Sequence, residues 1–268
     1  MIPKPKHLGP EFGAQFKDES VVKAYRFRPP YPDELFDILA NLIHSEQRSV
    51  LDIGCGDGNI ARNLIHRVDR LDAVDISEAM IEQGKNLPGG DHPHLRWILG
   101  PLEKVSLSPR YALVTAGHSL HWMDWEVVFS RIQALLESEG FLAIVSIKPS
   151  ANRWDAGIRD LIQQYSTNRD YRPYDIVAEL QKRELFEVIG EKHTMPMPFI
   201  QTVDAFIESW HSKNGLSRDR LSPKEAQAFD KQVRASVSNY NSGDTIEMLF
   251  TGHVVWGLPK NPYENNEA

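Results

Sequence analysis

The sequence predicts an α/β fold with a mostly parallel sheet, because strand and helix patterns alternate along the chain through residue 147. Residues 50–53 form a short apolar run that enters a glycine-rich stretch, and residues 71–74 form a second run that ends at Asp75. A later run, residues 141–147, is apolar except for Ser146, as expected for a strand covered on both faces. These three runs place the expected sheet in the first 150 residues or so.

Composition restricts the possible partners of the chain. The 268 residues carry a formal net charge of −7 with a pI near 5.8, which argues against nucleic acid because such partners usually require a basic surface. No apolar run approaches the roughly 20 residues of a membrane-spanning helix, and residues 1–6 lack the apolar centre of a secretory signal. The single cysteine fits a reducing compartment. We therefore expect a cytoplasmic monomer or homodimer without a membrane partner.

The stretch at residues 50–59 organises the chain. Gly54, Gly56 and Gly58 allow the backbone to bend sharply and a ligand to approach closely, and a helix is expected to follow with its first amides directed at that ligand. Asp75 lies 19 positions after Gly56, close to the spacing of about 20 for an acid that binds a ribose from the end of the second strand. Together these features predict a nucleoside-binding half-fold.

The glycine spacing identifies the preferred nucleoside. The order G-x-G-x-G, with Asp52 two residues before the first glycine, differs from the dinucleotide pattern G-x-G-x-x-G. The stretch LDIGCGDG at residues 51–58 resembles the first motif of class I S-adenosylmethionine-dependent methyltransferases. The resemblance implies a Rossmann-like, seven-stranded, mostly parallel sheet with a reversed last strand, an N-terminal cap and a helical insertion. It also implies that the glycine loop bends around the methionyl part of S-adenosylmethionine, that Asp75 holds its ribose, and that the product is S-adenosylhomocysteine.

A second resemblance lies nearer the N-terminus. Residues 25–32 (YRFRPPYP) resemble the cap of small-molecule methyltransferases related to the trans-aconitate enzymes, which implies that Tyr25 and Arg28 lie beside the cofactor carboxylate. The alternative is that Tyr25 packs on the core and Arg28 is a surface charge. Residues up to about Gly13 are rich in proline, lysine and glycine, so we expect them to be loosely draped and the N-terminal stretch to be ordered by the cofactor.

The adenine contacts depart from the family pattern. The resemblance places Ile76 against the adenine, but Pro101 stands where the family often has an aspartate that binds the adenine amino group. Recognition is then expected to fall to the backbone of Leu102 or to Glu103. The expected cofactor-binding residues are Tyr25, Arg28, Asp52, Gly54, Cys55, Gly56, Asp75, Ile76, Leu102, Glu103, Ala116 and Gly117.

The loop at residues 117–125 contains two histidines and two tryptophans after the expected fourth strand. Ligands of parallel sheets bind at the carboxyl ends of the strands, so this loop should face the transferred methyl group. His118 or His121 could act as a general base, could bind a metal, or could form the pocket wall with Trp122 packed on the cofactor. No cluster of Cys, His or Asp at ligand spacing supports a metal site, so none is expected.

Beyond Pro149 the alternation ends and helices dominate. We expect a single domain over residues 1–268, with a cap (1–31), a cofactor-binding core (32–148), a helical insertion or lid with one sheet strand (149–240), and the last strand and tail (241–268). Trp154 is expected to join Trp122 in the substrate pocket. The other candidate lid residues, for which ordinary helix packing is the alternative, are Arg153, Tyr171, Trp210 and His211.

The predicted function is methyl transfer from S-adenosylmethionine to an oxygen, nitrogen or carbon nucleophile of a small molecule. The signature Asp/Asn-Pro-Pro-Tyr/Phe is absent from the sequence, which disfavours methylation of exocyclic base amines. Two alternatives stay open: an NAD-type oxidoreductase, and an inactive scaffold that binds S-adenosylmethionine.

Overall fold

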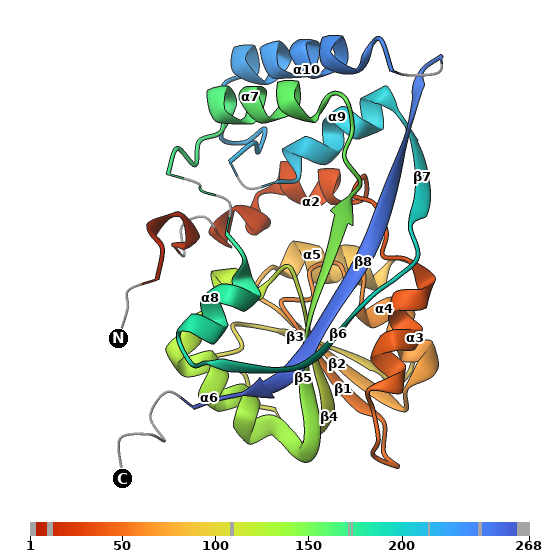
Figure 1. Ribbon diagram of the computed structural model, residues 1–268, viewed down its shortest axis with the longest axis vertical. Coiled ribbons are helices and arrows are strands. Elements are labelled where there is room, and N and C mark those ends of the chain that lie inside the picture. Colours follow the sequence, from red (N-terminus) through yellow and green to blue (C-terminus); the bar gives the residue numbers. More distant parts are fainter. Residues whose placement is uncertain are drawn as a thin grey trace.

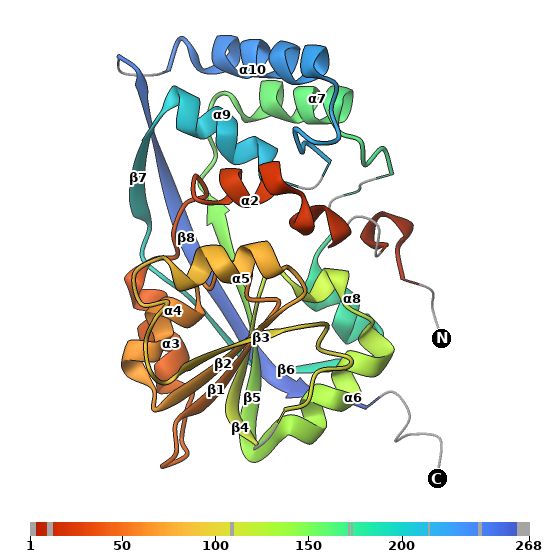
Figure 2. The same ribbon diagram turned by 180° about the vertical axis from the view of Figure 1, so that it is seen from behind.

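One sheet runs through the molecule, with helices on both of its faces and a further helical layer at one end (Figure 1). The computed structural model describes residues 4–9, 13–107, 110–170, 172, 174–213, 215–240 and 243–261. The strand order is β3-β2-β1-β4-β5-β8-β6, and β7 pairs with β8 off this path. The central strands converge below the helical layer, as the view from behind shows (Figure 2).

The sheet confirms the predicted parallel arrangement. Its parallel strands are β1 (Ser49–Ile53), β2 (Arg70–Asp75), β3 (Leu95–Leu99), β4 (Tyr111–Gly117) and β5 (Leu136–Pro149). The reversed strand β8 (Thr245–Pro259) is antiparallel to β5, to β6 (Phe186–His193) and to β7 (Met197–Thr202). The sheet therefore has eight strands rather than seven. Two strands, β6 and β7, pair one after the other with the same side of β8. Pro196 lies between them and has no amide hydrogen to donate to β8, so the pairing is interrupted there.

Strand β5 begins earlier than the sequence predicts. Helix α6 (Trp125–Leu135) passes directly into β5 at Leu136, five residues before the expected run at residues 141–147. Gly140 lies within β5, where a Cβ atom would stand 3.0 Å from the carbonyl oxygen of Tyr111. The register of β4 with β5 shifts between Tyr111 and Leu113. Glycine is needed here because β4 and β5 approach closely beside this irregularity.

Two apolar clusters cover the two faces of the sheet. Leu35 and Leu39 of α3 (Asp33–Asn41) and Leu64 of α4 (Ala61–Leu64) pack on one face. Phe129 of α6 and Leu180 of α8 (Ile176–Lys182) pack on the other. Helix α5 (Glu78–Lys85) begins after Ser77, whose hydroxyl accepts the Met80 amide as a cap.

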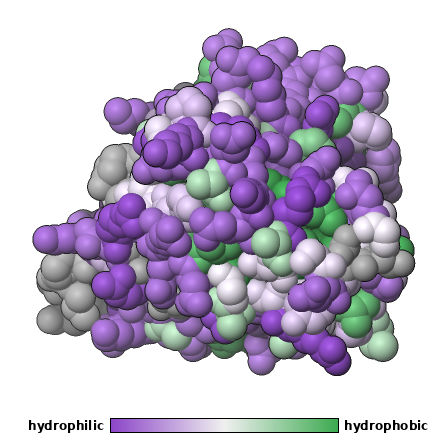
Figure 3. Space-filling view, turned by 90° about the horizontal axis from the view of Figure 1, so that it is seen from above, coloured by the Kyte–Doolittle hydropathy of each residue, from purple (hydrophilic) through white to green (hydrophobic). Residues whose placement is uncertain are grey.

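The helical layer has an apolar core of its own. It consists of α7 (Asp155–Tyr165), α9 (Val203–His211) and α10 (Pro223–Val237), which meet the ends of β7 and β8 around Phe206, Phe229 and Phe250. Its outer face is mostly hydrophilic, with a few apolar side chains between the polar ones (Figure 3). No helix in the described part of the chain has the length and apolar character needed to cross a membrane.

The N-terminal segment is held by protein contacts, which corrects the expectation that residues before Gly13 are loosely draped. Leu8, in the 3-10 turn Lys6–Leu8, is buried in the cluster under α6 and α8. Lys4 Nζ donates to the Met123 carbonyl at 2.9 Å. Gln15, in the 3-10 turn Ala14–Lys17, accepts the Gly215 amide at 2.9 Å. Residues 4–8 and 14–17 are thus held by polar anchors and one buried leucine, which compensate for the small apolar surface.

Candidate functional site

The glycine turn after β1 has the geometry that the sequence predicts. Gly54, Gly56 and Gly58 have φ angles of 62°, 57° and 77°, in the left-handed region that favours glycine. The Gly56 amide donates to Asp75 Oδ2 at 2.8 Å, and the Ser77 amide donates to Asp75 Oδ1 at 2.8 Å. Each carboxylate oxygen has two lone pairs. Asp75 therefore fastens the turn and keeps acceptor capacity for two hydroxyl groups of a ligand.

The expected helix after the turn is present but short. The left-handed glycines delay helix entry until Ala61, and α4 ends at Leu64 before a 3-10 turn, Ile65–Arg67. A helix of four residues aligns few peptide dipoles. The turn itself, rather than a helix terminus, therefore carries the binding chemistry.

Three buried carboxyl groups surround this turn. Asp52 Oδ1 accepts the Thr115 hydroxyl at 2.9 Å, whereas Asp52 Oδ2 and Asp57 Oδ1 are buried without a hydrogen bond of normal geometry to any described residue. Burial raises the pKa of Asp52 to about 7, and the Asp75 carboxylate contributes to this shift. Burial also raises the pKa of Asp57 and of Asp75. A site with these orphaned oxygens favours a cationic ligand and disfavours a pyrophosphate.

The cap lies over the turn. A Cβ atom at Gly56 would stand 3.5 Å from the Tyr25 hydroxyl, and one at Gly117 would stand 2.8 Å from the Tyr31 hydroxyl. Tyr25 is the last residue of α2 (Glu19–Tyr25), and both tyrosines are only partly buried. Tyr31 was not among the expected site residues, although it belongs to the YRFRPPYP stretch that marked the cap.

Arg28 connects the cap to the helical layer rather than standing as a surface charge. Its guanidinium lies 4.2 Å from the centre of the Tyr25 ring. Arg28 Nε donates to the Ser212 hydroxyl at 2.8 Å, and a second guanidinium nitrogen donates to the Ser212 carbonyl at 2.5 Å. Ser212 follows the last residue of α9, so Arg28 lies between the glycine turn and the end of this helix.

His118 is poorly arranged for general base catalysis. Its Nε2 accepts the Ile147 amide at 3.2 Å, so in the neutral ring the proton resides on Nδ1 and the Nε2 lone pair is already engaged. Burial, together with the charge of Arg28, lowers the pKa of His118 to about 4. Its backbone φ angle of 51° is unusual for a residue other than glycine.

His121 is the freer of the two histidines but is an even weaker base. Its ring packs 4.4 Å from that of Trp122 and 6.4 Å from that of Tyr174, and within the described chain its nitrogens have no hydrogen-bond partner. Burial lowers its pKa to about 3, with the charge of His118 next in importance. An efficient base has a pKa near the working pH. The geometry and the low pKa values therefore favour the interpretation that His118 and His121 form the pocket wall over the interpretation that either is a general base.

A lysine that no sequence pattern marked completes this side of the site. Lys213 Nζ lies 3.7 Å from the centre of the Trp210 ring. Burial and the charge of Arg28 lower the pKa of Lys213 to about 7. In the described part of the chain neither Arg28 nor Lys213 forms an ion pair with a carboxylate.

Five side chains, none of them fully buried, lie within electrostatic reach of one another, and we call the space beside them the recess. After burial, the charge of Arg28 acts on the pKa of each of the other four. These side chains are Tyr25, Arg28, His118, His121 and Lys213. The recess has a carboxylate-rich side at the glycine turn and a cationic side toward the end of α9.

The remaining expected cofactor residues lie at or beneath the same strand ends. Ala116 and Leu102 are buried, Gly117 touches Tyr31, and the buried Cys55 thiol faces the Gly56 carbonyl. Ile76 is exposed, as a wall for a planar ligand would be. Glu103 accepts the Asp124 amide at 3.0 Å, which ties it to the loop after β4.

The expected substrate-pocket residues separate. Trp122 packs on Phe16 of the N-terminal segment, with ring centres 5.8 Å apart, and borders the recess through His121. Trp154 is buried in the helical layer against Phe206 and Tyr240, so the structure does not bring it to the recess.

The candidate lid residues also differ in their environments. His211 is buried and bonded to Asp230, which gives it a structural environment, whereas Trp210 borders Lys213. Tyr171 lies outside the described residues.

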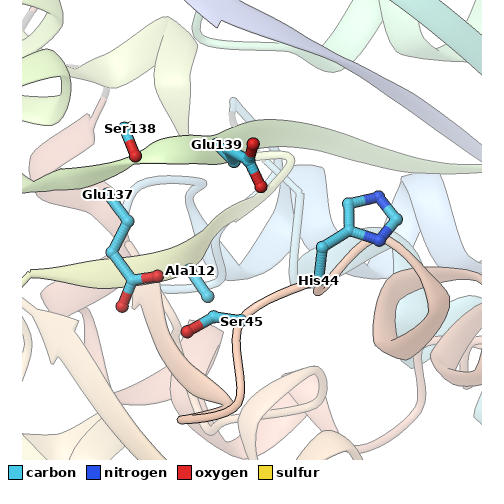
Figure 4. Close-up of a pocket in the computed structure, with 6 residues that line it drawn as sticks. All are labelled: His44, Ser45, Ala112, Glu137, Ser138 and Glu139. Carbon is cyan, nitrogen blue, oxygen red and sulfur yellow. The ribbon is translucent and has the colours of Figure 1, made fainter.

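A hollow lies at the opposite, amino-terminal end of the central strands (Figure 4). It measures about 160 Å³ and is lined by His44, Ser45, Ala112, Glu137, Ser138 and Glu139. These residues stand at the amino ends of β1, β4 and β5. Ligands of parallel sheets bind at the carboxyl ends, so the glycine turn and the recess remain the candidate site.

Comparisons with known proteins identify the family of the chain. The family described as "Methyltransferase domain" matches residues 50–140. A malonyl-[acyl-carrier protein] O-methyltransferase from Ilyobacter polytropus is 30% identical over 233 residues, covering 82% of this chain and 83% of that protein. A trans-aconitate 2-methyltransferase from Acidovorax sp. is 23% identical over 257 residues, covering 88% and 93%.

A solved structure supports the fold. A candidate type II methyltransferase from Anaeromyxobacter dehalogenans superposes with a TM-score of 0.62 at 22% identity, covering 87% of this chain and 99% of that one. The comparisons confirm the methyltransferase prediction and offer nothing for the oxidoreductase alternative. The chain belongs to the S-adenosylmethionine-dependent methyltransferases.

Proposed function

We propose that this protein transfers a methyl group from S-adenosylmethionine to a carboxylate oxygen of a small molecule. The observation that carries the proposal is the pair Arg28 and Lys213, two cations that face the recess without a carboxylate partner among the described residues. Burial, and after it the repulsion from Arg28, lowers the pKa of Lys213 to about 7. An anionic acceptor would relieve this repulsion and gain charge-assisted hydrogen bonds.

The weak histidine bases support the same acceptor. An alcohol or a protonated amine must lose a proton when it is methylated, and a base with a pKa of about 3 or 4 accepts that proton poorly. A carboxylate is already deprotonated at neutral pH. Methyl transfer to a carboxylate therefore needs only that the two reactants be oriented and that water be excluded, which the side chains around the recess can provide.

The carboxylate-rich side fits the cofactor. Bound S-adenosylmethionine supplies an electrophilic methyl group on a positively charged sulfur atom. We assign the ribose hydroxyls to Asp75, the methionyl chain to the turn at Gly54 and Gly56, and the adenine to Ile76 and the segment at residues 102–103. The orphaned oxygens of Asp52 and Asp57 suit a cationic ligand.

The substrates in the relatives' names are consistent with an acidic acceptor. Aconitate and malonyl groups both carry carboxylates, and one relative is named as an O-methyltransferase. We further propose that residues 1–31 act as the cap over the cofactor, that part of residues 149–240 covers the acceptor, and that the reaction takes place in the cytoplasm. The contacts of Tyr25 and Arg28 support the cap.

The test of the function is an assay with methyl-labelled S-adenosylmethionine. Di- and tricarboxylic acids should be compared with matched alcohols, phenols and amines, and the products identified by mass. We expect label in a methyl ester that mild alkali hydrolyses. Label found only in alkali-stable ethers or methylamines would contradict the carboxylate acceptor while leaving the methyltransferase activity intact.

The histidines should contribute little to the chemical step. His118→Gln and His121→Gln are each expected to lower kcat less than tenfold, because removal of a true general base costs about 10²–10⁴-fold. Glutamine at position 118 can still accept the Ile147 amide. Steady-state kinetics with saturating cofactor provides the measurement. A kcat loss of a hundredfold or more, with unchanged cofactor affinity, would identify the altered histidine as a base.

Lys213 should determine acceptor affinity. Lys213→Met is expected to raise KM for the acidic acceptor about 10–100-fold, since a hydrogen bond to a charged group contributes about 1.5–3 kcal/mol, with cofactor affinity nearly unchanged. In the wild type the ammonium loses its charge as pH rises through about 7, so KM should increase above neutrality. This pH dependence should disappear in Lys213→Met. The control is Lys224→Met on the exposed surface of α10, and equal KM changes in both variants would remove Lys213 from the site.

A further inference from the structure

Two histidines and a glutamate converge on the edge of the sheet, outside the methyl-transfer site. In the antiparallel pair of β6 and β8, His193 lies directly opposite His253. Glu191 precedes His193 by two residues and thus points to the same face of β6. The imidazole rings stack with centres 4.0 Å apart and planes 7° apart. His253 Nε2 lies 2.9 Å from Glu191 Oε2.

We propose that Glu191, His193 and His253 bind one divalent transition metal ion of the zinc, nickel or copper class. One donor atom of each residue lies within 4.8 Å of the other two. Two neutral imidazoles and a carboxylate form a borderline ligand set that suits these ions and does not suit magnesium or calcium. With three protein ligands, the fourth position falls to water.

The donors need only small movements to close around an ion. Zinc binds such ligands at about 2.0–2.2 Å, so the donors of a tetrahedral site stand about 3.3 Å apart. Glu191 and His193 are exposed, and their side-chain torsions can cover the difference. The rings must tilt out of their parallel stack so that both nitrogens aim at one point. The charge of Lys148 reaches His253 and opposes a cation, and the Glu191 carboxylate offsets this charge.

The position of the site indicates a structural effect. His193 is the last residue of β6, just before the edge divides at residues 194–196. An ion at this point would join β6 to the reversed strand β8, which also pairs with β5. Spacing along the chain could not reveal the cluster, because 60 residues separate the two histidines and only strand pairing unites them.

Isothermal titration of the chelator-stripped, tag-free chain with zinc chloride tests the proposal. We expect one site per chain with micromolar affinity, no heat with magnesium chloride, and a rise of several degrees in the thermal midpoint when zinc is present. His193→Asn should weaken zinc binding at least about tenfold and abolish the rise. Its metal-free midpoint should match that of the wild type, since the side chain is exposed. Glu191→Gln should weaken binding to a smaller extent.

The matched control is a second histidine group, in which His92 lies between His66 and His94 at ring distances of 5.4 and 5.6 Å. His92→Asn should leave zinc binding unchanged. The proposal is overturned if zinc does not bind, or if His193→Asn binds it as the wild type does. It is also overturned if the loss occurs in His92→Asn instead. None of these outcomes depends on whether the acceptor of the methyl group is a carboxylate.

Discussion

Gly56→Val is expected to abolish S-adenosylmethionine binding. Gly56 has a φ angle of 57°, a conformation in which a β-branched residue is strained. Its Cβ would stand 3.5 Å from the Tyr25 hydroxyl, and the two methyl groups would extend into the space between the turn and the cap. We assign that space to the methionyl chain. Calorimetric titration with S-adenosylhomocysteine should therefore show no binding.

Gly243→Val provides the matched control for backbone strain. Gly243 has a φ angle of 61°, yet a Cβ atom there would meet nothing within 4 Å. The variant should lose thermal stability to a similar degree and bind the cofactor normally. Binding lost in both variants would attribute the effect to folding. Normal binding by Gly56→Val would show that the ligand does not lie across this turn.

Asp75→Ala should weaken S-adenosylmethionine binding about 10²–10⁴-fold. Two ribose hydroxyls bonded to a carboxylate contribute about 1.5–3 kcal/mol each. The structure adds a second effect, because the Gly56 and Ser77 amides lose their acceptor and become unsatisfied in a buried position. The thermal midpoint without ligand should therefore fall as well, since each such group costs about 1–3 kcal/mol. Asp75→Asn, which retains one side-chain oxygen, should be intermediate in both measurements.

Asp72→Asn separates affinity from stability. Asp72 is a buried carboxylate on the same strand, β2, bonded to Arg96 at 2.6 Å and to the Tyr111 hydroxyl at 2.5 Å. Asparagine at this position should lower the thermal midpoint without reducing cofactor affinity. If Asp75→Ala binds S-adenosylmethionine as tightly as the wild type, Asp75 does not hold the ribose. Equal affinity losses at both positions would point to general destabilisation.

The glycine turn and its contact with Asp75 were predictable because their geometry is local. A strand, a glycine turn, a short helix and a second strand fix the distance between Gly56 and Asp75 within one supersecondary unit. Strands β1 and β2 cover the expected runs at residues 50–53 and 71–74. The spacing of these residues along the chain was therefore sufficient to predict both the glycine turn and the contact of Asp75 with it.

The neighbourhood of Arg28, Ser212 and Lys213, which we assign to the acceptor, was not predictable, because tertiary packing assembles it. Lys213 and Ser212 reach Arg28 from 184 or more positions away along the chain, and no periodicity marks either of them. Trp154 lies just before α7 and Lys213 lies just after α9, so each borders a helix of the same insertion. Only tertiary packing buries Trp154 in the core of the helical layer and leaves Lys213 beside Arg28. Leu8 was missed for a similar reason, since one buried leucine in a proline- and lysine-rich stretch gives no periodic signal.

The hydrogen bonds between Arg28 and Ser212 couple the affinity for the cofactor to the affinity for the acceptor. The same short segment touches the glycine turn through Tyr25 and the end of α9 through Arg28. If an acceptor carboxylate draws Arg28 away from Ser212, the position of Tyr25 over the cofactor changes with it. Linkage then requires that each ligand alter the affinity of the other by the same factor. Binding of the cofactor and binding of the acceptor would therefore be coupled through the side chain of Arg28.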